Sequence, residues 1–175
     1  MDVRFRPKAD IQRACAPDPL DLLAGLRLNT LRRYFTRPQM ESWASVLIGG
    51  RVDAVEQWEA LPCVVMLSNG YRVQVESLWR LLLAESLVLT SRDNGQLFWR
   101  NAPVHAITEL STNLVGRTLT EVQVTKGTAD LSLQFGTCTL QVIADSSGYE
   151  AWQVEAPTGT LAVGQGGGNV VVWDQ

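Results

Sequence analysis

Residues 129–152 read ADLSLQFGTCTLQVIADSSGYEAW, and this stretch decides the fold. Apolar side chains recur at every second position on both sides of Gly136, the spacing of strands that bury one face. We therefore expect strands over Ala129–Phe135 and Cys138–Val142. A polar segment, Asp145–Glu150, then separates them from a further strand that resumes at Trp152. The strand pair would bury Leu131, Leu133, Phe135, Cys138, Leu140 and Val142.

The same alternation occurs earlier in the chain. Cys63–Leu67 and Tyr71–Val75 read as short strands, and Ser68-Asn69-Gly70 between them is a strong hairpin turn because Asn and Gly tolerate positive φ. Gln74 and Gln141 would point outward. Further expected elements are strands or short helices at Trp79–Leu83 and Ser86–Thr90, a turn at Arg92–Gly95, and an extended segment at Gln96–Trp99.

The two halves of the chain also match each other in order, at separations of 66 to 74 residues. One jump of six residues in this separation lies between Val142 and Trp152, which is what an insertion of Asp145–Glu150 into a duplicated unit would produce. The matched pairs are Gly50-Arg51 with Gly116-Arg117, Val73–Val75 with Leu140–Val142, Trp79 with Trp152, Leu87–Leu89 with Leu161–Val163, and Trp99 with Trp173. Two such units would stack or share a sheet.

The N-terminal region has a different character. Residues 1–16 show no period and predict a flexible tail. Residues 17–46 predict a helical segment: Asp18 as N-cap and Pro19 at the first helical position precede an apolar stripe at helical spacing; a strand over Leu26–Tyr34 is the alternative. We expect a first β repeat over 47–100, a connector over 101–113 and a second repeat over 114–175. Residues 47–175 would form one compact α+β domain, mainly antiparallel, with the N-terminal helix packed on the sheet.

Composition and charge restrict the class of protein. The net charge is −3, but residues 38–175 hold seven basic and fourteen acidic side chains. This acidic body disfavours nucleic acid as a partner and suits a basic protein. No apolar run is long enough to span a membrane, and no secretory signal precedes the domain. Three cysteines without a CxxC pair favour reduced thiols in the cytoplasm.

Several catalytic and cofactor sites can be set aside. His105 is the single histidine, so a zinc site or a Ser-His-Asp triad would have to use it, and no supporting signature surrounds it. Gly164–Gly168 resembles a phosphate loop, but a strand follows it instead of a helix, which predicts a glycine hairpin. We expect no cofactor and no metal, and an enzyme is the less favoured class.

The polar segment carries the candidate binding residues, which are Asp145, Ser146, Ser147, Tyr149, Glu150 and Trp152. Asp145 can form an Asx turn with Gly148 in the left-handed region. Asp145 and Glu150 can also act as an acid/base pair or bind a hard cation. Tyr149 and Trp152 suit a protein-binding hot spot, although Trp152 is equally a core residue if it follows its partner Trp79.

Two segments resemble parts of known proteins. ADSSGYEAWQV, preceded by DLSLQF, is similar to the C-terminal end of small uncharacterised bacterial proteins with strand–SSGYExW–strand endings, some of which are immunity-like proteins of toxin systems. YRVQVESLWRLLLAESLVLTSRD resembles another segment of such proteins. The acidic body, the lack of a catalytic constellation and the tryptophan-rich β framework lead us to expect a non-enzymatic, cytoplasmic protein-binding module, most concretely an immunity-like inhibitor. Its acidic face would suit a basic toxin partner. The alternatives are a ligand-binding or enzymatic domain that uses the Asp145–Glu150 loop, and a structural subunit that forms a homodimer through a strand edge.

Overall fold

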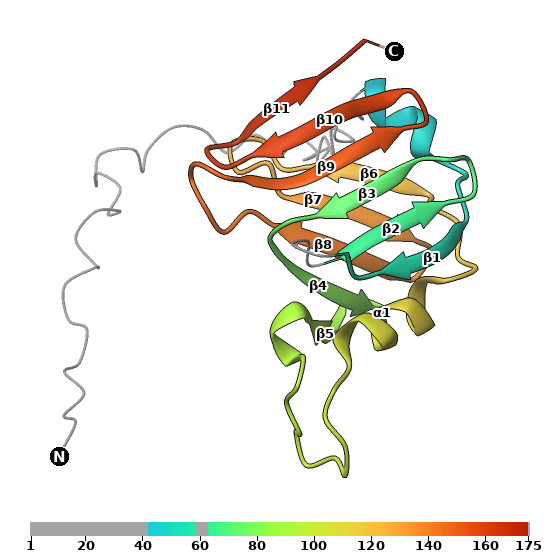
Figure 1. Ribbon diagram of the computed structural model, residues 1–175, viewed down its shortest axis with the longest axis vertical. Coiled ribbons are helices and arrows are strands. Elements are labelled where there is room, and N and C mark those ends of the chain that lie inside the picture. Colours follow the sequence, from blue (N-terminus) through green and yellow to red (C-terminus); the bar gives the residue numbers. More distant parts are fainter. Residues whose placement is uncertain (1–41, 59–62, 175) are drawn as a thin grey trace, which may run out of the picture. The chain divides into compact units, whose positions relative to one another are not determined.

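The computed structural model describes residues 42–58 and 63–174, which belong to one compact unit of the chain. Within it, eleven strands form two antiparallel sheets (Figure 1). The six-stranded sheet has the order β1-β2-β3-β9-β10-β11, and the five-stranded sheet has the order β5-β4-β8-β7-β6. The strands are β1 Val52–Glu56, β2 Cys63–Leu67, β3 Arg72–Val75, β4 Leu78–Leu83, β5 Ser86–Thr90, β6 Glu121–Val124, β7 Leu131–Phe135, β8 Cys138–Ile143, β9 Glu150–Ala156, β10 Gly159–Gln165 and β11 Asn169–Val172.

The prediction of a mainly antiparallel β-protein is confirmed. The described residues contain one α-helix, α1 (Ala106–Leu114), together with 3-10 helices at Ser42–Leu47 and Ser91–Asp93. Helix α1 falls in the segment expected to be a connector. The predicted tail and nearly all of the predicted N-terminal helical segment lie outside the described residues.

A single apolar core lies between the sheets, and alternation along the strands builds it. Every second residue of β7 and β8 is buried, so all six residues predicted to be buried there are core residues. Gln74 alternates with the core residues Val73 and Val75 and so lies on the outer face of β3, as predicted, although it is buried there. It lies on the central strand β3, paired with Val64 of β2 and with Gln153 of β9.

The chain crosses from one sheet to the other twice, and the two crossings lie side by side. The first joins β3 to β4 through Glu76 and Ser77, and the second joins β8 to β9 through residues 144–149. The Ser77 hydroxyl lies 2.9 Å from the carbonyl oxygen of Ile143 and 3.3 Å from that of Ala151, so it ties the crossings together. Two residues separate the paired positions Val75 and Leu78, whereas eight separate their partners Trp152 and Ile143. The second crossing is therefore six residues longer.

The segment between β5 and α1 differs from the sequence prediction. Gln96–Trp99 was expected to be extended, but it ends in a turn at the tip of a loop that projects from the sheets (Figure 1). Phe98 and Trp99 have φ values of 39° and 66°, in the left-handed region. The chain reverses at these two residues, where the Arg100 N–H donates to the carbonyl oxygen of Leu97 at 2.7 Å, and alternation alone does not reveal such a turn.

Candidate functional site

The segment 144–149, here called the crossing loop, carries most of the residues that the sequence singled out. A serine, and not the expected Asp145, forms its turn. The Ser146 hydroxyl accepts hydrogen bonds from the backbone N–H groups of Gly148 and Tyr149, both at 3.2 Å. Gly148 does not adopt a positive φ. Serine hydroxyls make the same kind of turn as Asx side chains, so the turn was predicted but its acceptor was wrong.

A glycine-rich hairpin packs closely against the crossing loop. The Gly166 N–H donates to the carbonyl oxygen of Tyr149 at 2.8 Å. A Cβ added at Gly166 would lie 1.9 Å from the carbonyl oxygen of Ser146, which no side chain tolerates. Gly166–Gly168 connects β10 to β11, as the sequence predicted. These glycines permit close approach of two backbones, which fixes the shape of the crossing loop.

Next to the crossing loop is a shallow hollow of about 350 Å³. The β6–β7 turn forms its other wall, and the exposed Lys126 precedes that turn's Gly127. Asp130 holds the start of the crossing loop, because its carboxylate accepts the Ala144 N–H at 2.9 Å. The hollow is lined by Gly127, Thr128, Ala144, Asp145, Ser146, Ser147 and Gly167.

Carboxylates gather where the two crossings meet. Glu76 lies in the first crossing, and its backbone N–H donates to the carbonyl oxygen of Ala151 at 2.9 Å, directly after Glu150. Partial burial raises the pKa of the Glu76 carboxyl, and the charge of Glu150 raises it further. Asp145 and Glu150 themselves are exposed. Sequence reasoning paired Glu150 with Asp145 and missed Glu76, because only the register of β3 against β9 brings Glu76 to this place.

The two aromatic candidates have different environments. Tyr149 is 81% exposed and stands at the end of the crossing loop. Trp152 is fully buried, stacks on Trp43 with ring centroids 5.7 Å apart, and donates from Nε1 to the carbonyl oxygen of Ala129 at 2.7 Å. Trp152 is therefore a core residue, the alternative that its match with the buried Trp79 indicated, and Tyr149 is the aromatic available to a partner.

A protein-family comparison bears on the region that holds this site. Residues 62–174, nearly two thirds of the chain, match the model of a family of unknown function, DUF6188. The chain belongs to the DUF6188 family. No curated protein and no solved structure matches it. The DUF6188 region spans β2 to β11, so it contains both crossings, the carboxylates and α1.

Other reactive side chains in the DUF6188 region are dispersed. His105 is exposed just before α1, and burial raises the pKa of the Cys63 thiol to about 12, so this cysteine stays protonated at neutral pH. Across residues 42–58 and 63–174, His, Cys, Asp and Glu side chains form no group of three or more with metal-binding geometry. None of the helices described there is long and apolar enough to cross a membrane.

Proposed function

We propose that this DUF6188 protein is a non-enzymatic protein-binding module, an immunity-like inhibitor whose crossing-loop end masks a basic partner. One observation carries the proposal. Tyr149 stands 81% exposed on a loop of fixed shape, next to the carboxylates Asp145 and Glu150, with Glu76 behind them. An exposed tyrosine is a favourable anchor because it offers a large, rigid and amphipathic contact area.

The electrostatics of the loop end favour a cation in the partner. Two carboxylates whose charges raise a pKa repel each other, and an arginine or lysine that approached Glu76 and Glu150 would relieve that repulsion. The arginines of β3 and β4 are already engaged, since Arg72 pairs with Glu155 and Arg80 donates to Gln141. Complementary charge of this kind speeds association and sets partner choice more than it sets affinity.

The loop is also held in place before binding. Ser146 caps its turn, Asp130 holds its first residue and Gly166 fixes its last. A loop that is already ordered loses less conformational entropy when a partner binds. This supports recognition by a preformed surface.

The test is affinity capture with the tagged protein in lysate of its own cells, in low and in high salt. We expect a basic protein that binds the wild type, is weakened by salt, and is lost with Tyr149→Ala and with Glu150→Gln. Trp173→Ala, at a tryptophan that is 44% exposed outside this surface, is the matched control and should retain the partner. Equal capture by Tyr149→Ala and the wild type would contradict the proposal.

A second candidate function is a ligand-binding or enzymatic site at the same end. Glu76 and Glu150 form a carboxylate pair with one raised pKa, which is the pattern of a general acid beside a base, and the 350 Å³ hollow lies beside the crossing loop. If a small molecule binds there, Glu76→Gln together with Glu150→Gln should abolish its binding without unfolding the protein. Unchanged binding would exclude this candidate.

We further infer that the two halves of the domain arose by duplication. The strand order supports this, since β1-β2-β3-β9-β10 and β6-β7-β8-β4-β5 run in corresponding order through the two sheets. The matched segments around Gly50 and Gly116 also pair with each other: Gly116 N–H donates to Val52, and Gly49 N–H donates to Leu119. The six extra residues of the second crossing coincide with the proposed insertion.

The unpaired buried cysteines Cys63 and Cys138 support a cytoplasmic location.

A further inference from the structure

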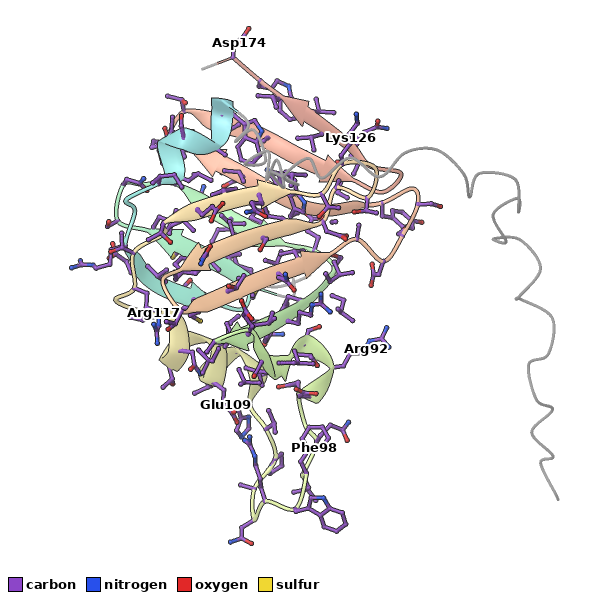
Figure 2. The ribbon with its side chains drawn as sticks, turned by 180° about the vertical axis from the view of Figure 1, so that it is seen from behind. Arg92, Phe98, Glu109, Arg117, Lys126 and Asp174 are labelled. Atoms are coloured by element: carbon purple, nitrogen blue, oxygen red, sulfur yellow. The ribbon has the colours of Figure 1, made fainter. Side chains whose placement is uncertain are left out.

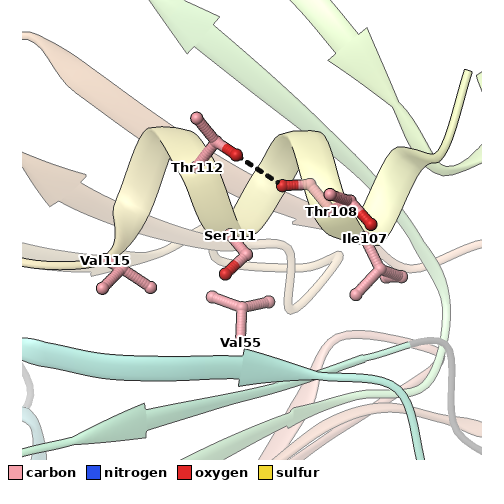
Figure 3. A pocket seen from close by; sticks show the side chains of 6 residues that line it. All are labelled: Val55, Ile107, Thr108, Ser111, Thr112 and Val115. Atoms are coloured by element: carbon pink, nitrogen blue, oxygen red, sulfur yellow. Dashed lines mark hydrogen bonds between the residues drawn. The ribbon is translucent and has the colours of Figure 1, made fainter.

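The described part of the chain has four strands at the edges of its two sheets, and the fold protects three of them. Helix α1 contacts both β1 and β5, and Figure 3 shows it running beside β1 across a hollow of about 530 Å³. The 3-10 helix Ser42–Leu47 contacts β6, whose first residue is the charged Glu121. A covering helix and a charge on the strand both prevent an edge from pairing with another chain.

The fourth edge, β11, has neither kind of protection from the residues that the structure describes. Its sequence contains no charged side chain and no proline, and it pairs with β10 without a register shift. Figure 1 shows β11 as the last strand of its sheet. Its apolar side chains are also accessible, since Val171, Val172 and Trp173 are 38%, 46% and 44% exposed. An apolar, uncovered edge of this kind is a template for a further strand.

The hydrogen bonds to β10 show which backbone groups of β11 face the open side. The Trp173 N–H donates to the carbonyl oxygen of Leu161 at 2.9 Å, and Trp173 lies opposite Leu161 in the register of the two strands. Bonding alternates along an antiparallel strand, so Val171 also bonds to β10, whereas the N–H and C=O groups of Val170 and Val172 point away from it. Those groups fit another extended backbone.

The two ends of β11 carry opposite charges. Asp174 follows the strand, and Lys126 lies near its start, because a Cβ added at Gly168 would collide with the backbone of Gly127 (Figure 2). Both charged side chains are exposed, and neither forms an ion pair with another residue in the described ranges. Asp174 alternates onto the face of Val170, which packs against the core, and the β6–β7 turn with Lys126 lies on that face.

We propose that β11 pairs antiparallel with β11 of a second copy, about a twofold axis at Val171, and so joins two six-stranded sheets into one. Val170 then lies opposite Val172 of the other copy, and these two residues exchange the backbone hydrogen bonds that each edge leaves open. On the outer face, Trp173 lies diagonally across from Val171 of the other copy, a separation that an aromatic side chain spans. The exposed apolar side chains of this edge are thereby covered.

The same register brings the opposite charges together. Asp174 of one copy falls opposite Gly168 of the other, beside that copy's Lys126, and the twofold axis repeats the contact. A strand of an unrelated protein would satisfy the backbone equally well, but a second copy also supplies a matching charge at each end. Twofold pairing uses both edges and closes the assembly, so it forms a dimer and no filament. The paired segments are short, so we expect a weak dimer.

Single cysteines in a Cys15→Ser background test the register, with glutathione disulfide as the oxidant. Val171→Cys places two cysteines directly opposite each other with Cα atoms about 4.5 Å apart, within the range of a disulfide. The cysteines of Val172→Cys would be offset by two positions along the strands, beyond the about 7 Å that a disulfide spans. Val172 is the more exposed of the two, so random collision would favour it. We expect Val171→Cys to form the covalent dimer at least about tenfold faster.

Sedimentation of the full chain up to about 500 µM, a range suited to a small interface, tests the contacts. Val172→Pro deletes an N–H that faces away from β10, so the sheet is kept while the dissociation constant should rise about 10–100-fold. Lys126→Asp should raise it about tenfold, and adding Asp174→Lys should restore it, because both ends are then matched again. Trp173→Ala should weaken the dimer yet retain the partner of the crossing loop, which separates the two surfaces.

Four outcomes would overturn the proposal. They are equal rates of cross-linking for Val171→Cys and Val172→Cys, a wild type that remains a monomer at every concentration, a dimer that Val172→Pro leaves unchanged, and a charge swap that restores nothing. A monomeric wild type would leave the β11 edge to a strand of another protein.

Discussion

Replacement of two buried tryptophans by phenylalanine, one at a time, tests how the core is held. Trp152 on β9 is 0% exposed and Trp79 on β4 is 1% exposed. The two residues occupy matched positions of the two halves of the sequence. Trp152 Nε1 donates to the carbonyl oxygen of Ala129 at 2.7 Å, whereas Trp79 Nε1 has no hydrogen-bond partner among the residues that the structure describes. The two sites therefore differ in this hydrogen bond and in the stacking of Trp152 on Trp43.

The expected magnitudes follow from these contacts. Trp152→Phe leaves the Ala129 carbonyl unpaired in the core, which costs about 1–3 kcal/mol. Both replacements also lose part of a ring, at about 1–2 kcal/mol each. Trp79→Phe removes an unpaired N–H and orphans no acceptor, so it should destabilise the protein less, by about 2 kcal/mol relative to Trp152→Phe. Ala129 has a φ of 60°, and loss of the bond that holds it there adds to the cost for Trp152.

Urea unfolding followed by circular dichroism measures this difference directly. The free energies of unfolding of the two variants should be compared at equal m-values, because a changed m-value reports a changed unfolded or native state. Equal costs for the two variants, or a larger cost for Trp79→Phe, would refute the assignment of the hydrogen bond as the difference between the two sites.

Three further predictions concern the crossing-loop end and the core. Gly166→Ala should destabilise the protein by about 3 kcal/mol in urea unfolding, since its Cβ meets the Ser146 backbone and neither chain can yield; a loss under 1 kcal/mol would contradict that contact. In the folded state the pKa of the Glu76 carboxyl is raised above its ordinary value of 4.5, so near and above that pH the folded protein binds more protons than the unfolded chain. The free energy of unfolding therefore falls as the pH rises from 4.5 through the folded pKa. Glu76→Gln should therefore be more stable than the wild type at pH 7 but not at pH 4. Glu85→Gln, on the exposed β4–β5 turn, is the control for replacement of a surface glutamate. In a Cys15→Ser background, iodoacetamide at pH 8 should leave Cys63 of the native protein unmodified and should modify it only after unfolding, because the pKa of this thiol is about 12. Rapid labelling of Cys63 itself in the native protein would disprove its burial.

The sequence predicted local features of the fold well and long-range ones poorly. Alternation predicted the buried faces of β7 and β8, and Ser68-Asn69-Gly70 predicted the β2–β3 hairpin, because both signals depend on neighbouring residues. No local signal indicates that β3 pairs with β9 or that β4 pairs with β8. The projection of Gln96–Trp99 depends on the hydrogen bonds that join Gly95 and Gln96 to Val104 at the base of the loop, so the prediction of an extended segment was wrong.

The candidate site shows the same division. The sequence identified the crossing loop and its exposed Tyr149, since polar residues between two strands predict an accessible loop. The sequence predicted Asp145 as the hydrogen-bond acceptor of the turn, whereas the structure has Ser146 in that role. The two side chains were not distinguished because both form similar turns. Glu76 could not be found from spacing. It joins Glu150 only through the register that places Val75 opposite Trp152.

The double crossing between the sheets has a consequence for synthesis on the ribosome. Strand β3 is central in its sheet, yet one of its neighbours, β9, is made only after α1 and five further strands, β4 to β8, have been translated. At roughly 5–20 residues per second, β3 waits about 4–15 seconds with an open edge before Trp152 emerges. The nascent chain therefore keeps one edge of β3 unpaired while the 77 residues from Val75 to Trp152 are added. We expect chaperone dependence and aggregation of fragments that end before β9, even where the complete domain is stable.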